Sequence, residues 1–147
     1  MACTIVSVPG ALFTLWGTPP VEDLQCVSAE MQAAVERAGR PILYVARVPP
    51  RAPAPDAAAR KYLNGMLAQF VASCSSFHAV VEGSGFGAAF KRGVLLSAFQ
   101  LNWAQHKFYV HANMEQVLDV LDGRARPVAA AIIASAGGKG LLQQELA

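Results

Sequence analysis

Apolar positions along the chain follow two spacings, one typical of strands and one typical of helices. Short runs that are rich in Val, Ile, Phe and Tyr and are bounded by Pro, Gly or polar residues predict five strands. The runs cover residues 4–8, 11–16, 42–48, 77–82 and 107–111. Pro9-Gly10 separates the first two runs and predicts that they form a hairpin. The third run is apolar at nearly every position, as expected for a strand that is covered on both faces.

Four helices are predicted where apolar residues recur every three or four positions. The first spans residues 21–38 and ends at Gly39, and the second follows Asp56, which can cap it. The third follows Gly85, and the fourth has Asn113 and Gln116 as a capping box and ends at Gly123. The apolar faces of the last three helices are Leu63, Met66, Leu67, Phe70, Val71 and Cys74; Phe86, Phe90, Val94 and Phe99; and Val117, Leu118 and Leu121.

The resulting order, β-β-α-β-α-β-α-β-α, predicts a single α/β domain at residues 4–122 with a mixed, mostly parallel sheet and helices packed against it. Residues 123–147 are interpreted as a C-terminal tail with short helices, the first starting near Pro127. In such a sheet the loops that follow the parallel strands gather at one edge, where open α/β sheets usually bind their ligands. Residues 49–56, 83–85 and 112–113 are expected at that edge.

The composition is poor in charge, with 15% charged and 54% apolar residues among the 147, against about 25% charged residues in an ordinary globular chain. Part of the surface must therefore be apolar, which favours a protein partner, a homo-oligomer or a ligand that covers it. The net charge is only +2, and the basic residues form no continuous stripe, so nucleic acid is not an expected partner. Arg60-Lys61 and Lys91-Arg92 are interpreted as solvated helix faces.

Cys3, Cys26 and Cys74 have neither the even number of a disulfide framework nor a metal-binding spacing, which favours a reducing cytoplasm. The first residues lack the positively charged region of a secretory signal. The longest charge-free apolar run, at residues 127–136, is half of what a bilayer crossing needs. The sequence therefore predicts a cytoplasmic protein without a membrane span.

A glycine motif follows the fourth predicted strand. Gly83, Gly85 and Ala88 form G-x-G-x-x-A between a strand and a helix, the context of a dinucleotide-binding turn. The ribose-binding acid expected about 20 residues later is missing, and a tight turn that starts a helix explains the glycines equally well. Ser84 has no nucleophile motif, since Glu82 stands where the first glycine of that motif would be. Ser84 is interpreted as a helix cap, with phosphorylation as the alternative.

The remaining polar residues do not form a recognisable catalytic set. His78, His106 and His111 lie on or beside strands, with no metal spacing along one element, and a hydrogen-bonded structural role is favoured for them. Asp56 and Glu82 are the acids at the predicted edge, and capping and loop bracing explain them. We therefore expect no catalytic residues, no metal and no cofactor.

A proline-rich segment precedes Asp56. Pro49-Pro50-Arg51-Ala52-Pro53-Ala54-Pro55 can join neither a sheet ladder nor a helix interior. A stiff, extended loop with Arg51 at its centre can bind a partner at a low cost in conformational entropy. The alternative is a spacer that only reaches the next helix.

The order of elements, together with Val110-His111-Ala112-Asn113-Met114-Glu115-Gln116-Val117-Leu118 at the last strand-to-helix junction, resembles the STAS domains. That family includes anti-sigma-factor antagonists and related bacterial regulatory modules. The likeness covers about residues 4 to 122 and rests on topology and loose patterns. Members carry an Asp-Ser-Ser-Gly-type motif, with a phosphorylated hydroxyl, where the second helix opens. The matching place here is Pro55-Asp56-Ala57-Ala58, so Asp56 is retained but two alanines replace the hydroxyl residues.

The resemblance implies a non-enzymatic regulatory or scaffolding module that binds another protein in a signalling context. Ser84, in Glu82-Gly83-Ser84-Gly85-Phe86-Gly87, is the alternative phosphorylation site, although it falls one β-α unit later than the family motif. The alternative function is a small-molecule or nucleotide-binding domain that uses the Gly83-Ser84-Gly85 turn. The residues expected to bind the partner are Arg51, Pro53, Asp56, Glu82, Ser84 and Asn113.

Overall fold

The structure is a computed structural model, and it describes residues 3–16, 21–50, 56–83, 88–89, 92–93, 108–121, 123 and 125–142. Strands and helices alternate after an opening hairpin. In chain order the elements are β1 (Cys3–Val8), β2 (Ala11–Trp16), α1 (Val21–Ala38), β3 (Ile42–Val48), α2 (Ala57–Ser73), β4 (Cys74–Val81), β5 (Phe108–His111), α4 (Glu115–Asp119) and α5 (Ala125–Gly138).

The five strands form one sheet in the order β1-β2-β3-β4-β5. β1 is antiparallel to β2, while β2, β3, β4 and β5 all run parallel to one another. The β1–β2 turn places Gly10 at φ 83°, a backbone conformation that glycine adopts without a steric penalty. The predicted α/β class, the hairpin and the mixed, mostly parallel sheet are thereby confirmed.

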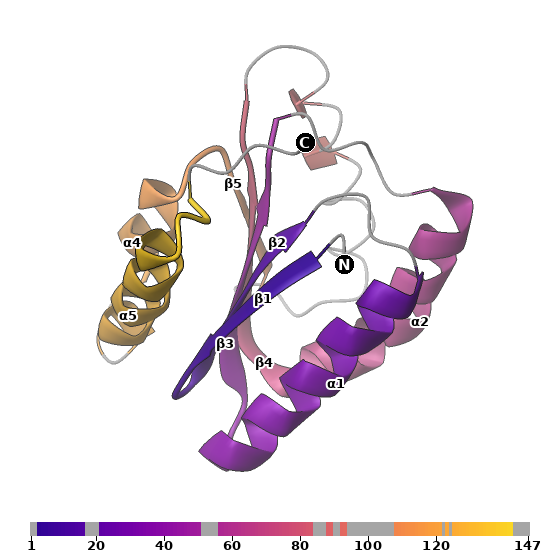
Figure 1. The fold of residues 1–147 in the computed structure, drawn as a ribbon, viewed down its shortest axis with the longest axis horizontal. Coiled ribbons are helices and arrows are strands. Elements are labelled where there is room, and N and C mark those ends of the chain that lie inside the picture. The colour runs from indigo at the N-terminus through magenta and orange to yellow at the C-terminus, as the bar shows by residue number, and fades with distance from the viewer. Residues whose placement is uncertain are drawn as a thin grey trace.

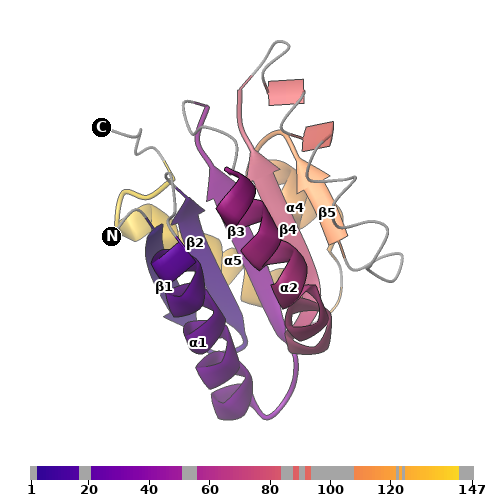
Figure 2. The ribbon, with the colours of Figure 1, turned by 90° about the vertical axis from the view of Figure 1, so that its right-hand side faces the viewer.

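Helices cover both faces of the sheet, so the molecule has three layers (Figure 1). α1 and α2 lie side by side on one face, and α4 and α5 lie on the other (Figures 1 and 2). β3 is the central strand, and six of its seven residues are buried, as its continuous apolar run predicts.

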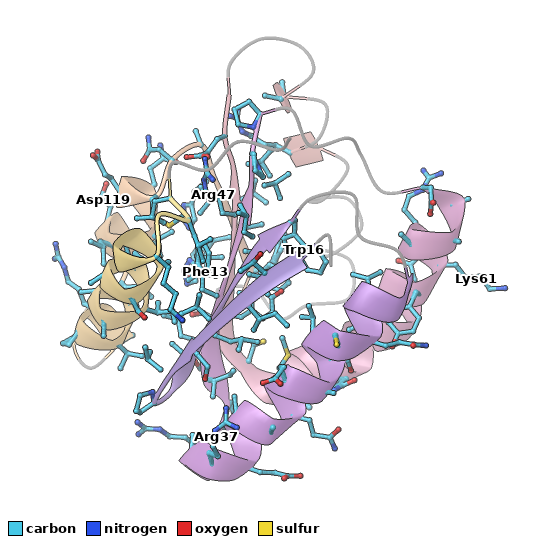
Figure 3. The ribbon with its side chains drawn as sticks, in the orientation of Figure 1. Phe13, Trp16, Arg37, Arg47, Lys61 and Asp119 are labelled. Carbon is cyan, nitrogen blue, oxygen red and sulfur yellow. The ribbon has the colours of Figure 1, made fainter. Side chains whose placement is uncertain are left out.

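The face below α1 and α2 is an apolar layer with an aromatic centre. Tyr44 stacks on Phe77 at 4.7 Å between ring centroids, and Phe77 meets the edge of Phe108 at 5.1 Å. The Tyr44 hydroxyl forms a 2.9 Å hydrogen bond with the Thr14 hydroxyl, so both buried polar groups are satisfied. Trp16 packs partly against the same layer (Figure 3).

α5 closes the opposite face over β1, β2 and β3, where Phe13 lies in the layer that the helix covers (Figure 3). Ala129, Ile132 and Ala136 are fully buried on its inner side. The tail was expected to hold short helices; it instead contributes one 14-residue helix to the core. Its Ala-rich composition hid the pattern, because alanines are both the buried and the exposed residues of this helix.

Three details differ from the sequence prediction or fall outside the described residues. Cys74 was assigned to the apolar face of the second helix, but it is the first residue of β4 and is buried, with its sulfur 3.7 Å from that of Met31. Gly123 was expected to end the fourth helix, but α4 already ends at Asp119. Of the predicted third helix, residues 88–89 and 92–93 are helical, and the remainder, including its four inward residues, is outside the described part.

Candidate functional site

The carboxyl ends of β3, β4 and β5 lie at one edge of the sheet. The register places Val48 beside Val81, and Val80 beside His111. Five of the described residues that follow these ends are called the carboxyl rim: Asp56, Glu82, Gly83, Ala112 and Asn113. Three of the six predicted partner-binding residues, Asp56, Glu82 and Asn113, are therefore found there. Arg51, Pro53 and Ser84 are outside the described residues.

Asp56 and Asn113 are exposed residues that hold the first turns of their helices. An Asp56 carboxylate oxygen accepts the Ala59 N–H at 2.8 Å, as the sequence predicted for a cap of α2. The Asn113 side-chain oxygen accepts the Gln116 N–H at 3.1 Å, and the Gln116 side chain accepts the Ala112 N–H at 2.7 Å. The predicted capping box is therefore formed only in part: Asn113 binds the Gln116 N–H, but the Gln116 side chain accepts from Ala112 and not from Asn113, and Met114 stands at the N-cap position of α4.

Glu82 belongs to a partly buried ion pair. The Arg47 guanidinium, only 3% exposed, donates from Nε to the Glu82 carboxylate at 2.5 Å. Its Nη1 donates to the Leu141 carbonyl at 3.0 Å, just after α5. Arg47 therefore joins β3, the end of β4 and the segment after α5, and it lies between the sheet and the α4–α5 layer (Figure 3). Because a buried charge without partners is costly, this arrangement fixes the position of Glu82 on the rim.

The Gly83 turn is fixed by contacts on several sides. Gly83 has φ 109°, and a Cβ placed there would lie 3.4 Å from the Pro50 side chain. Arg92 donates from Nε to the Val81 carbonyl at 3.0 Å and from Nη2 to the Gly83 carbonyl at 2.7 Å. The interpretation of Arg92 as part of a solvated helix face is therefore wrong, because its guanidinium binds the end of β4. Lys61, in contrast, extends outward from α2 (Figure 3).

A second polar cluster lies on β4 and β5, on the face of the sheet that α4 and α5 cover. His78 Nδ1 and His111 Nε2 are 3.0 Å apart, and His78 Nε2 is 2.9 Å from the Ser76 hydroxyl. Tyr109 stacks on the His78 ring at 4.9 Å, with the planes inclined by 3°. The His78 residue is completely buried, and His111 is 5% exposed. These contacts confirm that His78 and His111 are hydrogen-bonded, as predicted. His106 is outside the described residues.

Burial determines the protonation of both histidines. The pKa of His78 is lowered from 6.5 to about 3. The main cause is the loss of solvent on burial, and the nearby His111 adds to it. Loss of solvent also lowers the pKa of His111, against an opposing effect of Asp119. Both rings are therefore neutral at pH 7, and a base with so low a pKa accepts protons poorly. Since the His78 ring also has no exposed surface, the cluster braces β4 against β5 and does not present a base to a substrate.

The sequence left the partners within these clusters unassigned, although a signal for each was present. Arg47 is the only charged residue of an otherwise apolar strand, which requires a buried partner, and Glu82 follows the next strand. His78 and His111 occupy neighbouring parallel strands, but their pairing depends on a register that the sequence does not define. The described residues contain no group of three or more His, Cys, Asp or Glu side chains that could hold a metal ion.

Comparisons with known proteins identify no relative: no family model matches the chain, and no curated protein or solved structure matches it significantly. No helix in the described part of the chain combines the length and the apolar character that a bilayer crossing requires.

Proposed function

We propose that this protein is a non-enzymatic interaction domain that binds another protein through its carboxyl rim, in a regulatory or scaffolding role like that of STAS domains. The supporting observation is that the polar side chains of the rim are held in place by internal contacts. Asp56 caps α2, Asn113 accepts the Gln116 N–H in the first turn of α4, and Arg47 binds Glu82. A surface whose side chains are already ordered loses little conformational entropy on binding, which raises its affinity for a partner.

The charge of the rim suggests how the partner is recognised. Asp56 is exposed, and Glu82 is 23% exposed, so both carboxylates can be reached by a basic group of a partner. Each uses one oxygen in a described internal bond, and a carboxylate has a second oxygen that can accept further hydrogen bonds. Arg51, in the proline-rich segment before Asp56, is proposed to add a cation to the same surface.

The test uses variants that keep the internal hydrogen-bond acceptors and remove the negative charge. In Asp56→Asn and Glu82→Gln the new side chains still offer an acceptor to the Ala59 N–H and the Arg47 Nε–H. Glu82→Gln costs some stability, because it removes the counter-charge of the buried Arg47. The tagged full-length protein and the double variant are used to capture proteins from the cells in which it is naturally made. Glu36→Gln is the control, because Glu36 is exposed near the end of α1, at the opposite end of the sheet from the rim.

We expect wild type and Glu36→Gln to capture the same specific protein, and the double variant to capture much less of it. Arg51→Glu should weaken capture in the same assay. Equal capture by wild type and the double variant would reject the carboxyl rim as the binding surface. Failure of the wild type to capture any specific protein would reject the proposed function.

One observation favours a second candidate, nucleotide binding at the Gly83-Ser84-Gly85 turn. Gly83 has a positive φ and follows a parallel strand at the rim, which is the usual ligand edge of an open α/β sheet. Isothermal calorimetry with nucleotides and phosphorylated metabolites tests this candidate directly. Saturable heat that disappears in Gly83→Val would support it over the interaction domain, and no heat at millimolar ligand would reject it.

A further inference from the structure

β1 is the outermost strand of the sheet, next to β2. Natural proteins usually protect such an edge with charged residues or proline, because its free N–H and C=O groups can pair with another strand. The β1 sequence, Cys3-Thr4-Ile5-Val6-Ser7-Val8, contains neither. Thr4 and Ser7 are exposed, whereas Val6 is buried in the layer that α5 covers.

We propose that a second copy of this chain pairs with β1, antiparallel and about a two-fold axis perpendicular to the sheet, to give a continuous sheet across a homodimer. Residues that lie opposite one another in an antiparallel pair point to the same face of the sheet. In a symmetric pair of β1 strands, the two-fold axis must therefore pass beside one residue that lies opposite its own copy, and not between two residues. The strand midpoint lies between Ile5 and Val6, and either residue can therefore lie on the axis. This surface is independent of the carboxyl rim.

The charges on α1 favour a second copy as the occupant. α1 runs in the same direction as β1, because both are antiparallel to β2 (Figure 1). Arg37 Nη2 donates to the Ser7 hydroxyl at 3.3 Å, so Arg37 is on the side of α1 next to the free edge. Glu30 is exposed and lies seven residues earlier on the same helix. Two helical turns separate them, so both lie on one side of α1 and about 10 Å apart along its axis.

The two-fold operation reverses this order in the second copy. Arg37 of one copy lies opposite Glu30 of the other when the two-fold axis passes midway between the positions of Glu30 and Arg37 along α1. Arg37 is taken to be level with Ser7, which it contacts, so the axis lies about 5 Å from Ser7 along the strand direction. At roughly 3.3 Å per strand residue, that point is about one and a half residues before Ser7, at Ile5 or Val6. The same position of the two-fold axis therefore brings Arg37 opposite Glu30 and aligns the midpoints of the two β1 strands. Two symmetric Arg37–Glu30 pairs would flank the new strand pair.

The opposite face of the sheet leaves room for this arrangement. α5 covers β1 and β2 there. Its exposed residues after Pro127 are small, namely Ala130, Ala131, Ala134, Gly137 and Gly138. Helices with small side chains can approach to the 8–10 Å separation that is usual for packed helices. No bulky side chain of α5 at these positions prevents two copies from meeting edge to edge.

Charge reversal on α1 tests the proposal without disturbing the core, because Glu30 and Arg37 are both exposed. Sedimentation equilibrium of the full-length protein from about 1 µM to about 1 mM gives the dimer dissociation constant. We expect Arg37→Glu to raise that constant about tenfold, because it places like charges opposite one another twice. The double variant Arg37→Glu/Glu30→Arg should restore the wild-type value. Thr4→Lys should weaken the dimer by placing a charge on the edge strand.

Circular dichroism of each variant confirms that the fold is unchanged. A wild-type protein that is monomeric throughout this range would overturn the proposal. A dimer whose dissociation constant is the same in wild type, Arg37→Glu and Thr4→Lys would overturn β1 as the interface. A double variant that is as weak as Arg37→Glu would overturn the pairing with Glu30.

Discussion

The buried histidine pair makes the stability of this protein depend on pH. His78 is completely buried, and burial together with His111 lowers its pKa from 6.5 to about 3. In the unfolded chain the pKa of the His78 ring returns to about 6.5. Below that pH the unfolded state therefore binds a proton that the folded state does not. Stability is therefore fully present above about pH 6.5 and is lost progressively as the pH falls toward about 3.

The size of the effect follows from the shift. Each pH unit between the two pKa values changes the free energy of unfolding by about 1.4 kcal/mol. When the pH is lowered from about 7.5 to about 5, roughly one and a half units of this range lie below 6.5. His78 alone should therefore lower the free energy of unfolding by about 2 kcal/mol. His111 acts in the same direction, because burial lowers its pKa as well. Asp119 opposes the effect at His111, since a nearby carboxylate favours the imidazolium.

Urea unfolding, followed by circular dichroism, measures the free energy at each pH. The comparison is between wild type and the double variant His78→Gln/His111→Gln, whose amides can hydrogen-bond but do not titrate. The double variant should lose at least about 2 kcal/mol less than wild type over the same pH interval. Only this difference in slope is interpreted, so a general loss of stability in the variant does not affect the result.

An equal loss in wild type and the double variant would refute the reasoning. It would mean that the histidines ionise alike in the folded and unfolded chains, and hence that the pair is hydrated and not buried. A wild-type stability that rises toward pH 5 would contradict the sign of the argument.

Three further changes test single contacts by urea unfolding at neutral pH. Arg47→Met should cost about 3 kcal/mol, because it leaves the Leu141 carbonyl and Glu82 without their donor; no loss would show that water replaces the ion pair. Asp56→Ala should cost about 1 kcal/mol and Asp56→Asn almost nothing, and equal effects would argue against a capping role. Gly83→Ala should cost about 1–3 kcal/mol, because φ is 109°, whereas Gly65→Ala, in open space on α2, should gain about 0.5–1 kcal/mol; the reverse order would contradict the described backbone.

Much of the fold could be predicted from the sequence, because the relevant signals are local. The apolar run of β3 has the same bounds in the prediction and in the structure, Ile42–Val48. Gly39, at φ 69°, ends α1 where the change from a periodic run to glycine placed the boundary. Strands separated by helices then required a mostly parallel sheet.

The errors arose where tertiary packing outweighs local pattern. Cys74 continued the spacing of the second helix, but its burial against Met31 belongs to a strand that starts directly after Ser73. The tail helix α5 has few large residues, so its contribution to the core depends on the sheet face beneath it. Because alanines lie on every side of this helix, the spacing of apolar residues does not by itself separate its buried face from its exposed one.

The candidate site divides in the same way. The cap at Asp56 and the pair of Asn113 and Gln116 were predictable, because their hydrogen bonds span three or four residues along the chain. Arg47 and Glu82 are 35 residues apart, and His78 and His111 are 33 apart. Contacts over such separations depend on strand order and register, which local spacing does not specify.

The packing of α5 on β1 and β2 has a consequence for synthesis in the cell. The hairpin leaves the ribosome before the helix that covers its second face, which comes from residues 125–138. Until that helix emerges, Phe13 and Leu15 lack the cover that they have in the finished protein. Nascent chains halted before residue 125 should therefore recruit chaperones, whereas the chain released from the ribosome should not.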